Sequence, residues 1–249
     1  MTVKIAIANQ KGGVGKTDLC VNLAASLSSF SFNTLLVDLD PQANATDYLT
    51  RNNPQSSTCD LLMKDEIKLE DITLKTDFPN LSLAPSSIGL SAAQVQLANE
   101  VNMQFRLKRK LKALDGFDYV FIDTPPSLGL LTVNALTACD QVIIPIQTHY
   151  FAMDGVTKLL DTVNTIKEDL NPNLSVKGIV LTMYDRRTSL SKEVEEKVRN
   201  AFRGKVFKTV IPINVKLAES PSHHQPIITY APRSTGAKAY LNLAKEFVG

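Results

Sequence analysis

The sequence predicts a single α/β domain, built as a doubly wound, mostly parallel sheet with helices on both faces. Short apolar runs rich in β-branched residues alternate along the chain with segments of helical periodicity. The runs are apolar at nearly every position, which is typical of parallel strands buried on both faces. With 249 residues and no repeat or linker, the chain is long enough for one large core, so we expect residues 1–249 to form one domain.

The individual elements follow from local patterns. A helix is expected over 18–29, where Leu19, Leu23 and Leu27 recur every four residues. A second helix is expected around Val156–Ile166, with the same apolar spacing. The Asn/Pro/Ser-rich stretch 51–58 is typical of a surface loop. Strands are expected at 3–8, 34–40, 119–123, 141–146, 175–183 and 205–212.

Composition excludes several classes of protein. The net charge of +2 alone predicts no special partner, but residues 185–249 carry twelve Lys and Arg against six Asp and Glu. This basic last quarter permits an anionic partner. No apolar run reaches the about 18 residues that span a bilayer, and no signal peptide is evident. The three cysteines form no CxxC pair, so we expect free thiols in a cytoplasmic protein.

A glycine-rich loop at 9–16 joins the first expected strand to the first expected helix. Gly12, Gly13 and Gly15 permit turns in which several backbone N–H groups converge on phosphate oxygens. The helix that follows adds its positive end, Lys16 can reach the β- and γ-phosphates, and the Thr17 hydroxyl can bind Mg²⁺. Position 10 is glutamine where the general GxxxxGK[ST] motif has glycine, so the loop is a K-G-G-V-G-K-T variant of that motif.

Three carboxylates fall where expected strands end, at the edge of the sheet where such folds bind ligands. Asp123 closes one strand and can hold Mg²⁺, usually through water. Asp38 and Asp40 flank Leu39 and would share one face of an extended strand, where metal binding or orientation of an attacking water is plausible. The stretch 41–46 is expected to be a flexible loop that orders on γ-phosphate contact.

Several stretches together resemble the ParA/Soj chromosome- and plasmid-partition ATPases, which share a deviant Walker A motif with MinD. The resemblance extends from about Lys4 to Phe247. It rests on KGGVGKT at 11–17, VDLDPQANAT at 37–46, FIDTPPSLGLLTVNAL at 121–136, IPIQTHYFAMDG at 144–155 and LAESPSHHQPI at 217–227.

The resemblance implies an ATP- and Mg²⁺-dependent cycle. ATP would create a sandwich homodimer, and slow hydrolysis, stimulated by a ParB-like protein, would dissolve it. Lys11 would reach the partner's nucleotide, which suits a transition state that gains from a second cation. The implied nucleotide-binding residues are Lys11, Gly12, Gly13, Val14, Gly15, Lys16, Thr17, Asp18, Met183 and Pro212. Lys11, Lys16 and Asp40 would be catalytic, Thr17, Asp40 and Asp123 would hold the metal, and Lys11 and Gly12 would face the partner subunit.

Asp18 departs from the family, which usually has threonine at this position. A carboxylate would repel a phosphate about 4 Å away by roughly 1–4 kcal/mol, depending on solvent access. The sequence therefore predicts that Asp18 either turns away from the nucleotide or weakens its binding.

The resemblance also implies non-specific binding of double-stranded DNA by the ATP dimer, and a nucleoid-associated protein. Arg187 matches one DNA-binding position, and Lys216 matches another where relatives usually have arginine. Ile213 and Gln225 stand where basic residues are common, and Arg186 is expected to compensate. A second basic cluster, Arg106, Lys108, Arg109, Lys110 and Lys112, is expected to be a solvated helix face, with DNA contact as the alternative.

Other classes remain as alternatives. A MinD-like, membrane-cycling regulator would need an amphipathic C-terminal helix, but Tyr240, Leu243 and Phe247 share a face that suits packing on the sheet, so we expect no membrane partner. Iron–sulfur reductases need cysteines in the loops after the core strands, which Cys20, Cys59 and Cys139 do not supply. An adaptor without turnover would not depend on Asp40. The adjacent His223 and His224 lack further ligands at metal-binding spacing.

Overall fold

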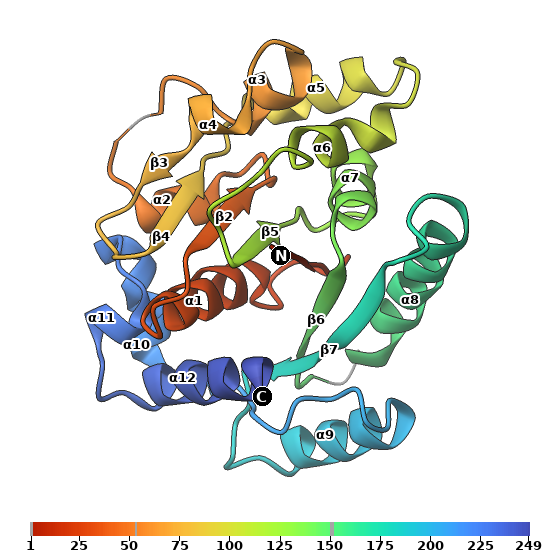
Figure 1. Cartoon of the computed structure of the whole chain (residues 1–249). Coiled ribbons are helices and arrows are strands. Elements are labelled where there is room, and N and C mark those ends of the chain that lie inside the picture. The colour runs from red at the N-terminus through yellow and green to blue at the C-terminus, as the bar shows by residue number, and fades with distance from the viewer. Residues whose placement is uncertain (1, 53, 150–151) are drawn as a thin grey trace.

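The computed structural model describes residues 2–52, 54–149 and 152–249, and for 152–155 the helical backbone only. Within these residues a seven-stranded sheet forms the centre of the molecule (Figure 1), with strand order β3-β4-β2-β5-β1-β6-β7. All neighbouring strands are parallel except the edge pair β3 and β4. The strands are β1 (Val3–Ile7), β2 (Thr34–Asp38), β3 (Leu74–Lys75), β4 (Leu81–Ala84), β5 (Tyr119–Asp123), β6 (Gln141–Gln147) and β7 (Ser175–Thr182).

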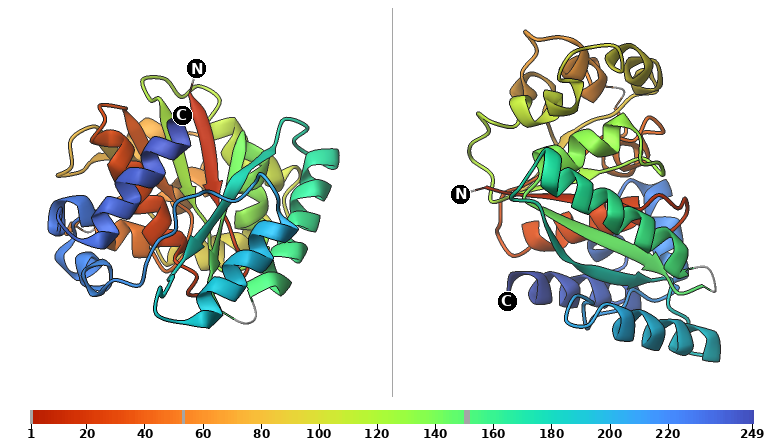
Figure 2. Two further views of the ribbon diagram at one scale, coloured as in Figure 1. Left: turned by 90° about the horizontal axis from the view of Figure 1, so that it is seen from below. Right: turned by 90° about the vertical axis from the view of Figure 1, so that its right-hand side faces the viewer.

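Helices cover both faces of this sheet, as Figure 2 shows in two further views. The expected doubly wound α/β fold is therefore confirmed. The helices are α1 (Lys16–Ser28), α2 (Asn44–Leu49), α3 (Thr58–Met63), α4 (Leu69–Ile72), α5 (Gly89–Leu97), α6 (Arg106–Lys110), α7 (Leu130–Ala138), α8 (Ala152–Asp169), α9 (Ser189–Ala201), α10 (Val215–Glu219), α11 (Ile227–Tyr230) and α12 (Thr235–Val248), with 3₁₀ turns η1 (Met103–Phe105) and η2 (Ser220–His223).

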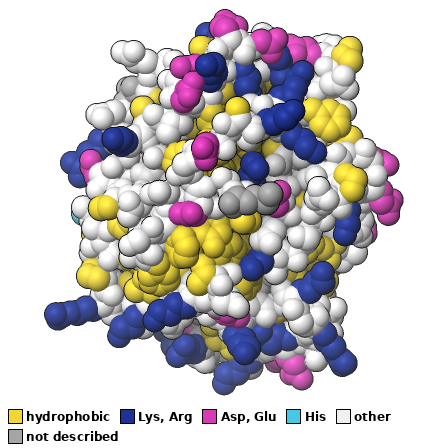
Figure 3. Space-filling view, viewed as in Figure 1, with side chains coloured by type: hydrophobic (Ala, Val, Ile, Leu, Met, Phe, Trp, Pro, Cys, Tyr) yellow, Lys and Arg dark blue, Asp and Glu magenta, His cyan; other side chains and the backbone are white. Residues whose placement is uncertain are grey.

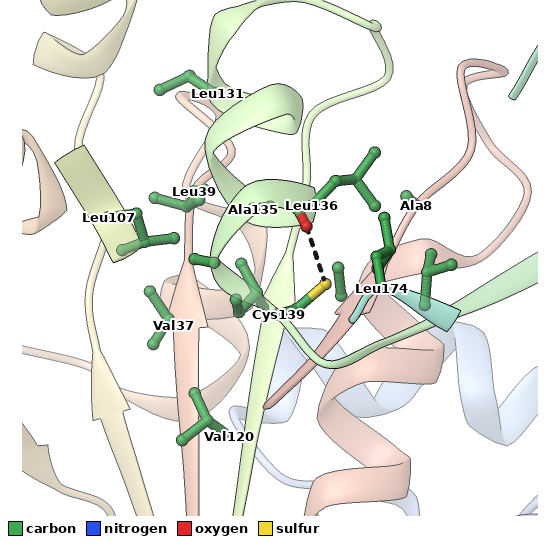
Figure 4. Packing of buried hydrophobic residues seen from close by; sticks show 14 of the residues in the cluster. Ala8, Val37, Leu39, Leu107, Val120, Leu131, Ala135, Leu136, Cys139 and Leu174 are labelled. Carbon is green, nitrogen blue, oxygen red and sulfur yellow. Dashed lines mark hydrogen bonds between the residues drawn. The ribbon is translucent and has the colours of Figure 1, made fainter. Parts of the chain in front are cut away.

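Each face of the sheet has its own apolar core. On one face, α1 and α12 pack against β1, β2 and β5, and the rings of Phe121 and Phe247 lie 6.1 Å apart. Tyr240, Leu243 and Phe247 are buried there, as their shared face predicted. On the other face, α7 and α8 cover the alternate strand residues. Figure 4 shows part of this core around α7, where the Cys139 thiol contacts the Leu136 carbonyl oxygen at 3.7 Å. The three cysteines are free.

One predicted strand is wrong. Residues 205–212 run beside β7 but form only isolated bridges, Ile179 with Val206 and Tyr184 with Pro212. The N–H groups of residues 208 and 209 donate to the Glu246 carboxylate on α12 instead of to a ladder. Pro212 has no N–H to offer. The segment is therefore held against the sheet without becoming a strand.

The carboxyl ends of β1, β2 and β5 meet at one edge of the sheet. Ile7 pairs with Asp123, and Asp123 pairs with Asp38 across the next strand. The sheet thus brings the loop after β1 and both strand-end carboxylates together, as the sequence predicted.

Candidate functional site

Hydrogen bonds at both ends fix the conformation of the glycine-rich loop between β1 and α1. The Asn9 side-chain amide donates to the Pro145 carbonyl at 2.7 Å and its oxygen accepts the Lys11 N–H at 3.0 Å. At the other end, the Thr182 hydroxyl donates to the Val14 carbonyl at 2.8 Å. Gly13 and Gly15 have φ angles of 72° and 80°, which only glycine adopts without strain. The loop is therefore a preformed cradle of backbone N–H groups.

Lys16 lies inside this cradle as a buried cation. Its side chain is only 7% exposed and its ammonium donates to the Lys11 carbonyl at 3.2 Å. Burial lowers the pKa of Lys16, and the nearby Asp123 and Asp40 carboxylates oppose that shift. These two carboxylates thus favour the charged form of Lys16 at the point where the loop can meet an anion.

Thr17 and Asp123 form a pair suited to a magnesium ion. The Thr17 hydroxyl donates to Asp123 Oδ2 at 2.8 Å, while Asp123 Oδ1 is buried and has no hydrogen-bond partner among the described residues. Burial, and then the neighbouring Asp38, raises the pKa of Asp123 well above its usual range. A cation would satisfy the orphaned oxygen and reverse that shift. The described residues contain no cluster of three His, Cys, Asp or Glu, so such an ion would also need phosphate and water ligands, as Mg²⁺ commonly does.

Asp38 and Asp40 have different environments. Asp38 is fully buried, and its carboxylate accepts the Asp40 N–H at 3.0 Å and the Thr46 N–H and hydroxyl at 2.9 and 2.8 Å. Burial raises the pKa of Asp38 to about 7. Asp38 therefore anchors the segment that follows β2, whereas Asp40 lies beyond the strand, accepts the Gln42 N–H at 3.0 Å and is held by Ser86, whose hydroxyl donates to the Asp40 carbonyl at 2.6 Å.

The segment after Asp40 differs from the expected flexible loop. Residues 41–42 form a turn, and the second half of the stretch already belongs to α2. Ala43 supplies the turn with a left-handed backbone (φ 54°). Thr46 then ties the start of the helix to Asp38.

A cavity of about 310 Å³ opens beside the glycine loop. Met183 and Pro212, both implied nucleotide contacts, line it from two adjacent segments, and Met183 has a positive φ of 51°. Backbone strain of this kind concentrates at functional sites. Asp18 also lines the cavity, and burial raises the pKa of its carboxyl to about 6. Asp18 therefore forms part of the wall of this cavity.

Sequence reasoning missed part of this cavity wall. Gln147, Asn214, Leu217 and Tyr240 line it together with Gly15. These residues come from β6, the start of α10 and the face of α12, and no local motif joins them. The one available signal was Asn214, whose side chain caps α10 by accepting the N–H groups of residues 216 and 217.

Lys11 and Gly12 lie on the outer side of the loop. Lys11 is partly exposed and forms no ion pair within the part of the chain that the structure describes. Gly12 is exposed, and a Cβ built on it would meet only Pro126 Cβ at 3.8 Å, an ordinary contact. A single chain thus has room for a side chain at position 12, so a steric demand for glycine would have to come from a second molecule.

The implied DNA-binding residues follow two adjacent segments. Tyr184 forms a β-bridge with Pro212, and the Tyr184 carbonyl accepts the Ile213 N–H at 3.1 Å. Arg186 and Arg187 follow the first of these paired segments in the sequence, and Lys216 follows the second. Arg187 is 85% exposed and binds Asp185 through two nitrogens at 2.9 and 2.8 Å, which lowers the pKa of Asp185 to about 2. Lys216 pairs with Glu219 at 2.8 Å. These exposed pairs are weak and exchangeable.

The second basic cluster is not one solvated face. Arg106 is buried and pairs with Asp65 and Glu100, and the Lys110 ammonium donates to three backbone carbonyls at 2.5–2.9 Å. The expectation is therefore wrong for these two residues. The histidine pair serves local packing: His223 stacks on Tyr230, and His224 Nδ1 contacts the Asp47 carbonyl.

The parallel sheet, the glycine cradle at the start of α1, and the Thr17–Asp123 pair define a P-loop protein with the deviant K-G-G-V-G-K-T motif. A family model described as an AAA domain matches residues 2–176. The chain is 50% identical to the sporulation initiation inhibitor protein Soj of Bacillus subtilis, over 97% of this chain and 96% of the relative. It is 44% identical to the chromosome partitioning protein ParA of Myxococcus xanthus, over 98% and 87%.

These similarities show that the chain belongs to the Soj/ParA family of chromosome partitioning proteins. Its fold is also similar to that of cobyrinic acid a,c-diamide synthase from Mycobacterium smegmatis, solved with a bound ATP analogue and magnesium. That structure has a TM-score of 0.86 and 35% identity over 98% of this chain and 93% of the other. The same fold thus occurs in proteins with different functions, and the residues of the site determine the chemistry of each.

Proposed function

We propose that this protein is an ATP-dependent DNA-partitioning ATPase. ATP with Mg²⁺ binds at the glycine loop and drives sandwich dimerisation, and the dimer binds double-stranded DNA without sequence preference. A ParB-like partner stimulates slow hydrolysis, which releases the DNA. Family membership supports the ATPase class, and the buried Lys16 beside the Thr17–Asp123 pair supports nucleotide binding. We place the protein in the cytoplasm, associated with the nucleoid.

Different residues of the chain bind the phosphates, the Mg²⁺ ion and the base. The loop N–H groups and Lys16 hold the phosphates, and Thr17 and Asp123 hold Mg²⁺, which neutralises phosphate charge when it is bound. The base enters the cavity between Met183 and Pro212, whose volume of about 310 Å³ is at the small end of ligand sites.

Hydrolysis needs a positioned water and a second cation. Asp40 lies at the same sheet edge as Asp123, and the Ser86 and Gln42 contacts fix its place, so it suits the orientation of the attacking water. Lys11 lies on the open side of the loop and suits donation to a partner's nucleotide, where Gly12 would lie at the subunit boundary. An adaptor without turnover would not need this arrangement.

The position of helix α10 is the main support for the proposed coupling between nucleotide binding and DNA binding. Asn214, Leu217 and Ala218 line the candidate nucleotide cavity, and Lys216, between them in the sequence, is half-exposed. Figure 3 shows Lys and Arg side chains gathered along the lower edge of the molecule, where Figure 1 shows α9 and α12. One short helix thus contacts the nucleotide pocket and presents a cation to solvent.

A buried polar network ties α10 to the rest of the site. The Tyr48 hydroxyl lies 2.5 Å from the Ser220 hydroxyl at the end of α10, and the Asn22 amide on α1 donates to Tyr48 at 3.1 Å. Asn22 also accepts the Ile227 N–H at 2.8 Å. The network joins the helix of the glycine loop, the segment after Asp40 and the basic C-terminal segment, so a change at the nucleotide has a packed route to Lys216.

The proposal is tested by an electrophoretic mobility shift on a long duplex of arbitrary sequence, with ATP, with ADP and without nucleotide, across a range of salt. We expect a shift with ATP only, with a steep decrease in affinity as salt rises, because phosphate contacts release counterions. Equal shifts in all three states would contradict the proposal, and binding to anionic vesicles instead would favour the MinD-like alternative. The buried apolar face of α12 argues against that alternative. Among the described residues, none of the helices has the length and apolar character of a membrane-spanning segment.

Replacing Lys216 by glutamate is expected to weaken DNA binding about tenfold and to flatten its salt dependence, because each subunit loses one phosphate contact. The same assay measures both effects. ATP-dependent dimerisation, followed by light scattering, should be unchanged. The matched control is Lys75→Glu, the same charge change on the exposed edge strand β3, which should leave DNA binding unaltered. If both variants lose affinity equally, Lys216 has no specific place in the DNA interface.

Replacing Asp18 by threonine is expected to tighten ATP binding about tenfold or more at pH 8. At that pH the Asp18 carboxyl is ionised, since its pKa is about 6, and removing a charge near the phosphates recovers roughly 1–4 kcal/mol of repulsion. Isothermal titration calorimetry with a non-hydrolysable ATP analogue measures the change. Asp47→Thr, in the exposed first turn of α2, is the control and should have no effect. Unchanged affinity in Asp18→Thr would show that the carboxylate does not approach the nucleotide.

A further inference from the structure

A second cavity, of about 570 Å³, lies at the opposite edge of the sheet from the glycine loop. Lys4 at the start of β1, and Cys139 and Asp140 just before β6, form part of its wall, so it sits at the amino ends of the strands. The rest of the wall comes from the end of η1, α6 and the residues that follow it, the end of α7, and the segment between α8 and β7. Nothing in the proposed ATPase cycle uses this cavity.

Four cations converge on it. Lys108, Arg109 and Lys112 line the cavity from the α6 segment, and Lys4 joins them from β1, more than a hundred residues away in the sequence. None of the four forms an ion pair within the described ranges. Asp140 is the acidic residue in this wall, and one of its oxygens already accepts the Lys4 N–H at 2.8 Å. The wall therefore has an excess of three positive charges.

The same helix shows why these cations are distinct from their neighbours. Arg106 and Lys110 use their charges on Asp65, Glu100 and backbone carbonyls, as described above. The cluster seen in the sequence thus separates into two internally bonded residues and three that line the cavity. Lys4 joins these three cations only in the folded protein, because the fold brings the start of β1 to the same cavity as the α6 segment.

The floor of the cavity is apolar and contains an unused polar group. Leu111, Ala138 and Cys139 are buried there, and the half-buried Phe105 ring has the Lys108 ammonium 6.0 Å from its centre. Thr137 is fully buried in the same wall, and its hydroxyl has no hydrogen-bond partner among the residues that the structure describes.

We propose that this cavity binds a compact organic phosphate of the nucleotide class, with its ring against Phe105 and its phosphate among Lys4, Lys108, Arg109 and Lys112. Small-molecule sites are concave, mostly apolar, and carry a few convergent polar groups, and this cavity has that composition. Arginine offers a planar fork to phosphate oxygens, and an aromatic ring offers a face to a base. A DNA backbone, in contrast, is bound by open basic surfaces. The proposal is independent of the ATPase cycle.

The chain contains no tryptophan, so Phe105→Trp places a single fluorescent reporter at this site. AMP, GMP and inorganic pyrophosphate are the probes, each titrated into the full-length Phe105→Trp protein. We expect saturable quenching by the two nucleotides and competition by pyrophosphate. Adding Arg109→Glu or Lys112→Glu should raise the half-saturating concentration at least tenfold. The matched control, Lys197→Glu on the exposed face of α9, should not change it.

Two further arms separate the possible outcomes. Adding Lys16→Ala should leave the quenching intact, because the glycine loop lies at the other edge of the sheet; loss of quenching would assign the signal to the ATP site and overturn the proposal. No saturable response to any probe, or a response that survives both charge reversals, would also overturn it. An acidic peptide, poly-glutamate, serves as the competing probe: quenching by the peptide alone would replace the small-ligand site with a protein-docking site. Circular dichroism checks that each variant is folded.

Discussion

Replacing Lys16 by alanine is expected to reduce affinity for ATP by about 100-fold or more and to abolish ATP-dependent dimerisation. Lys16 is the buried cation of the glycine loop, and truncating one partner of a buried charged contact costs on the order of 2–5 kcal/mol. Because dimerisation in the proposed cycle requires bound ATP, the variant should remain monomeric. Calorimetry with a non-hydrolysable analogue measures affinity, and light scattering with ATP measures assembly.

A second lysine of the same loop supplies the control. Lys11→Ala should leave the affinity of the monomer within about threefold, because Lys11 is partly exposed and its role is proposed to lie across the dimer. The Lys11 variant should nevertheless fail to dimerise. Since Lys16 also balances Asp123 and Asp40, a thermal melt must show that Lys16→Ala is folded. A folded Lys16→Ala protein that still dimerises on addition of ATP would refute the site.

The contiguous part of the site could be predicted from the sequence because its chemistry is local. The loop at 11–17 carries its glycines, its lysine and its threonine within a few residues, between a strand and a helix that their own periodicities predict. Asp123 could be added because parallel strands end at one edge, and the Thr17–Asp123 hydrogen bond confirms that they meet. Each inference needed only short-range pattern and the general geometry of parallel sheets.

The parts that could not be predicted depend on tertiary contacts. Residues 205–212 have a strand-like pattern, but Glu246 takes two of their N–H groups, and α12 must be placed before that is known. Short β4 lacks a long apolar run. Leu217 and Tyr240 reach the cavity through the packing of α10 and α12, where Leu217 lies so close to Gly236 that a Cβ there would meet it at 2.8 Å. No pattern in the sequence encodes that approach.

The separate roles of the two carboxylates at the end of β2, Asp38 and Asp40, also could not be predicted from the sequence. On a regular strand Asp38 and Asp40 would share a face and could exchange roles. The structure separates them, because Asp38 uses its carboxylate to hold Thr46 and the Asp40 N–H, whereas Asp40 lies beyond the strand end. The chemical assignment to Asp40 therefore follows from what Asp38 is already bonded to.

Replacing Asp40 by alanine is expected to lower the rate of ATP hydrolysis about 100-fold or more while leaving ATP binding intact, because the residue is proposed to orient the attacking water and general acid–base groups contribute about 10²–10⁴-fold. The ATP-bound dimer should accumulate and stay on DNA. Single-turnover hydrolysis and the dissociation rate from immobilised duplex measure the two effects. Normal turnover, or a variant that remains monomeric with ATP, would remove Asp40 from catalysis.

The neighbouring carboxylate, Asp38, provides a comparison variant for this test. Asp38→Ala should instead destabilise the fold, because the Thr46 and Asp40 N–H groups would lose their buried acceptor at a cost of roughly 1–3 kcal/mol for each unpaired group. A thermal melt distinguishes the two variants: Asp40→Ala should melt near the wild-type temperature and Asp38→Ala well below it. If only Asp40→Ala combines a normal melt with a trapped dimer, then the geometry after β2 has separated a structural carboxylate from a catalytic one two residues away. The release of DNA would then depend on a single residue, Asp40, whose carboxylate accepts the Gln42 N–H and whose backbone carbonyl accepts the Ser86 hydroxyl.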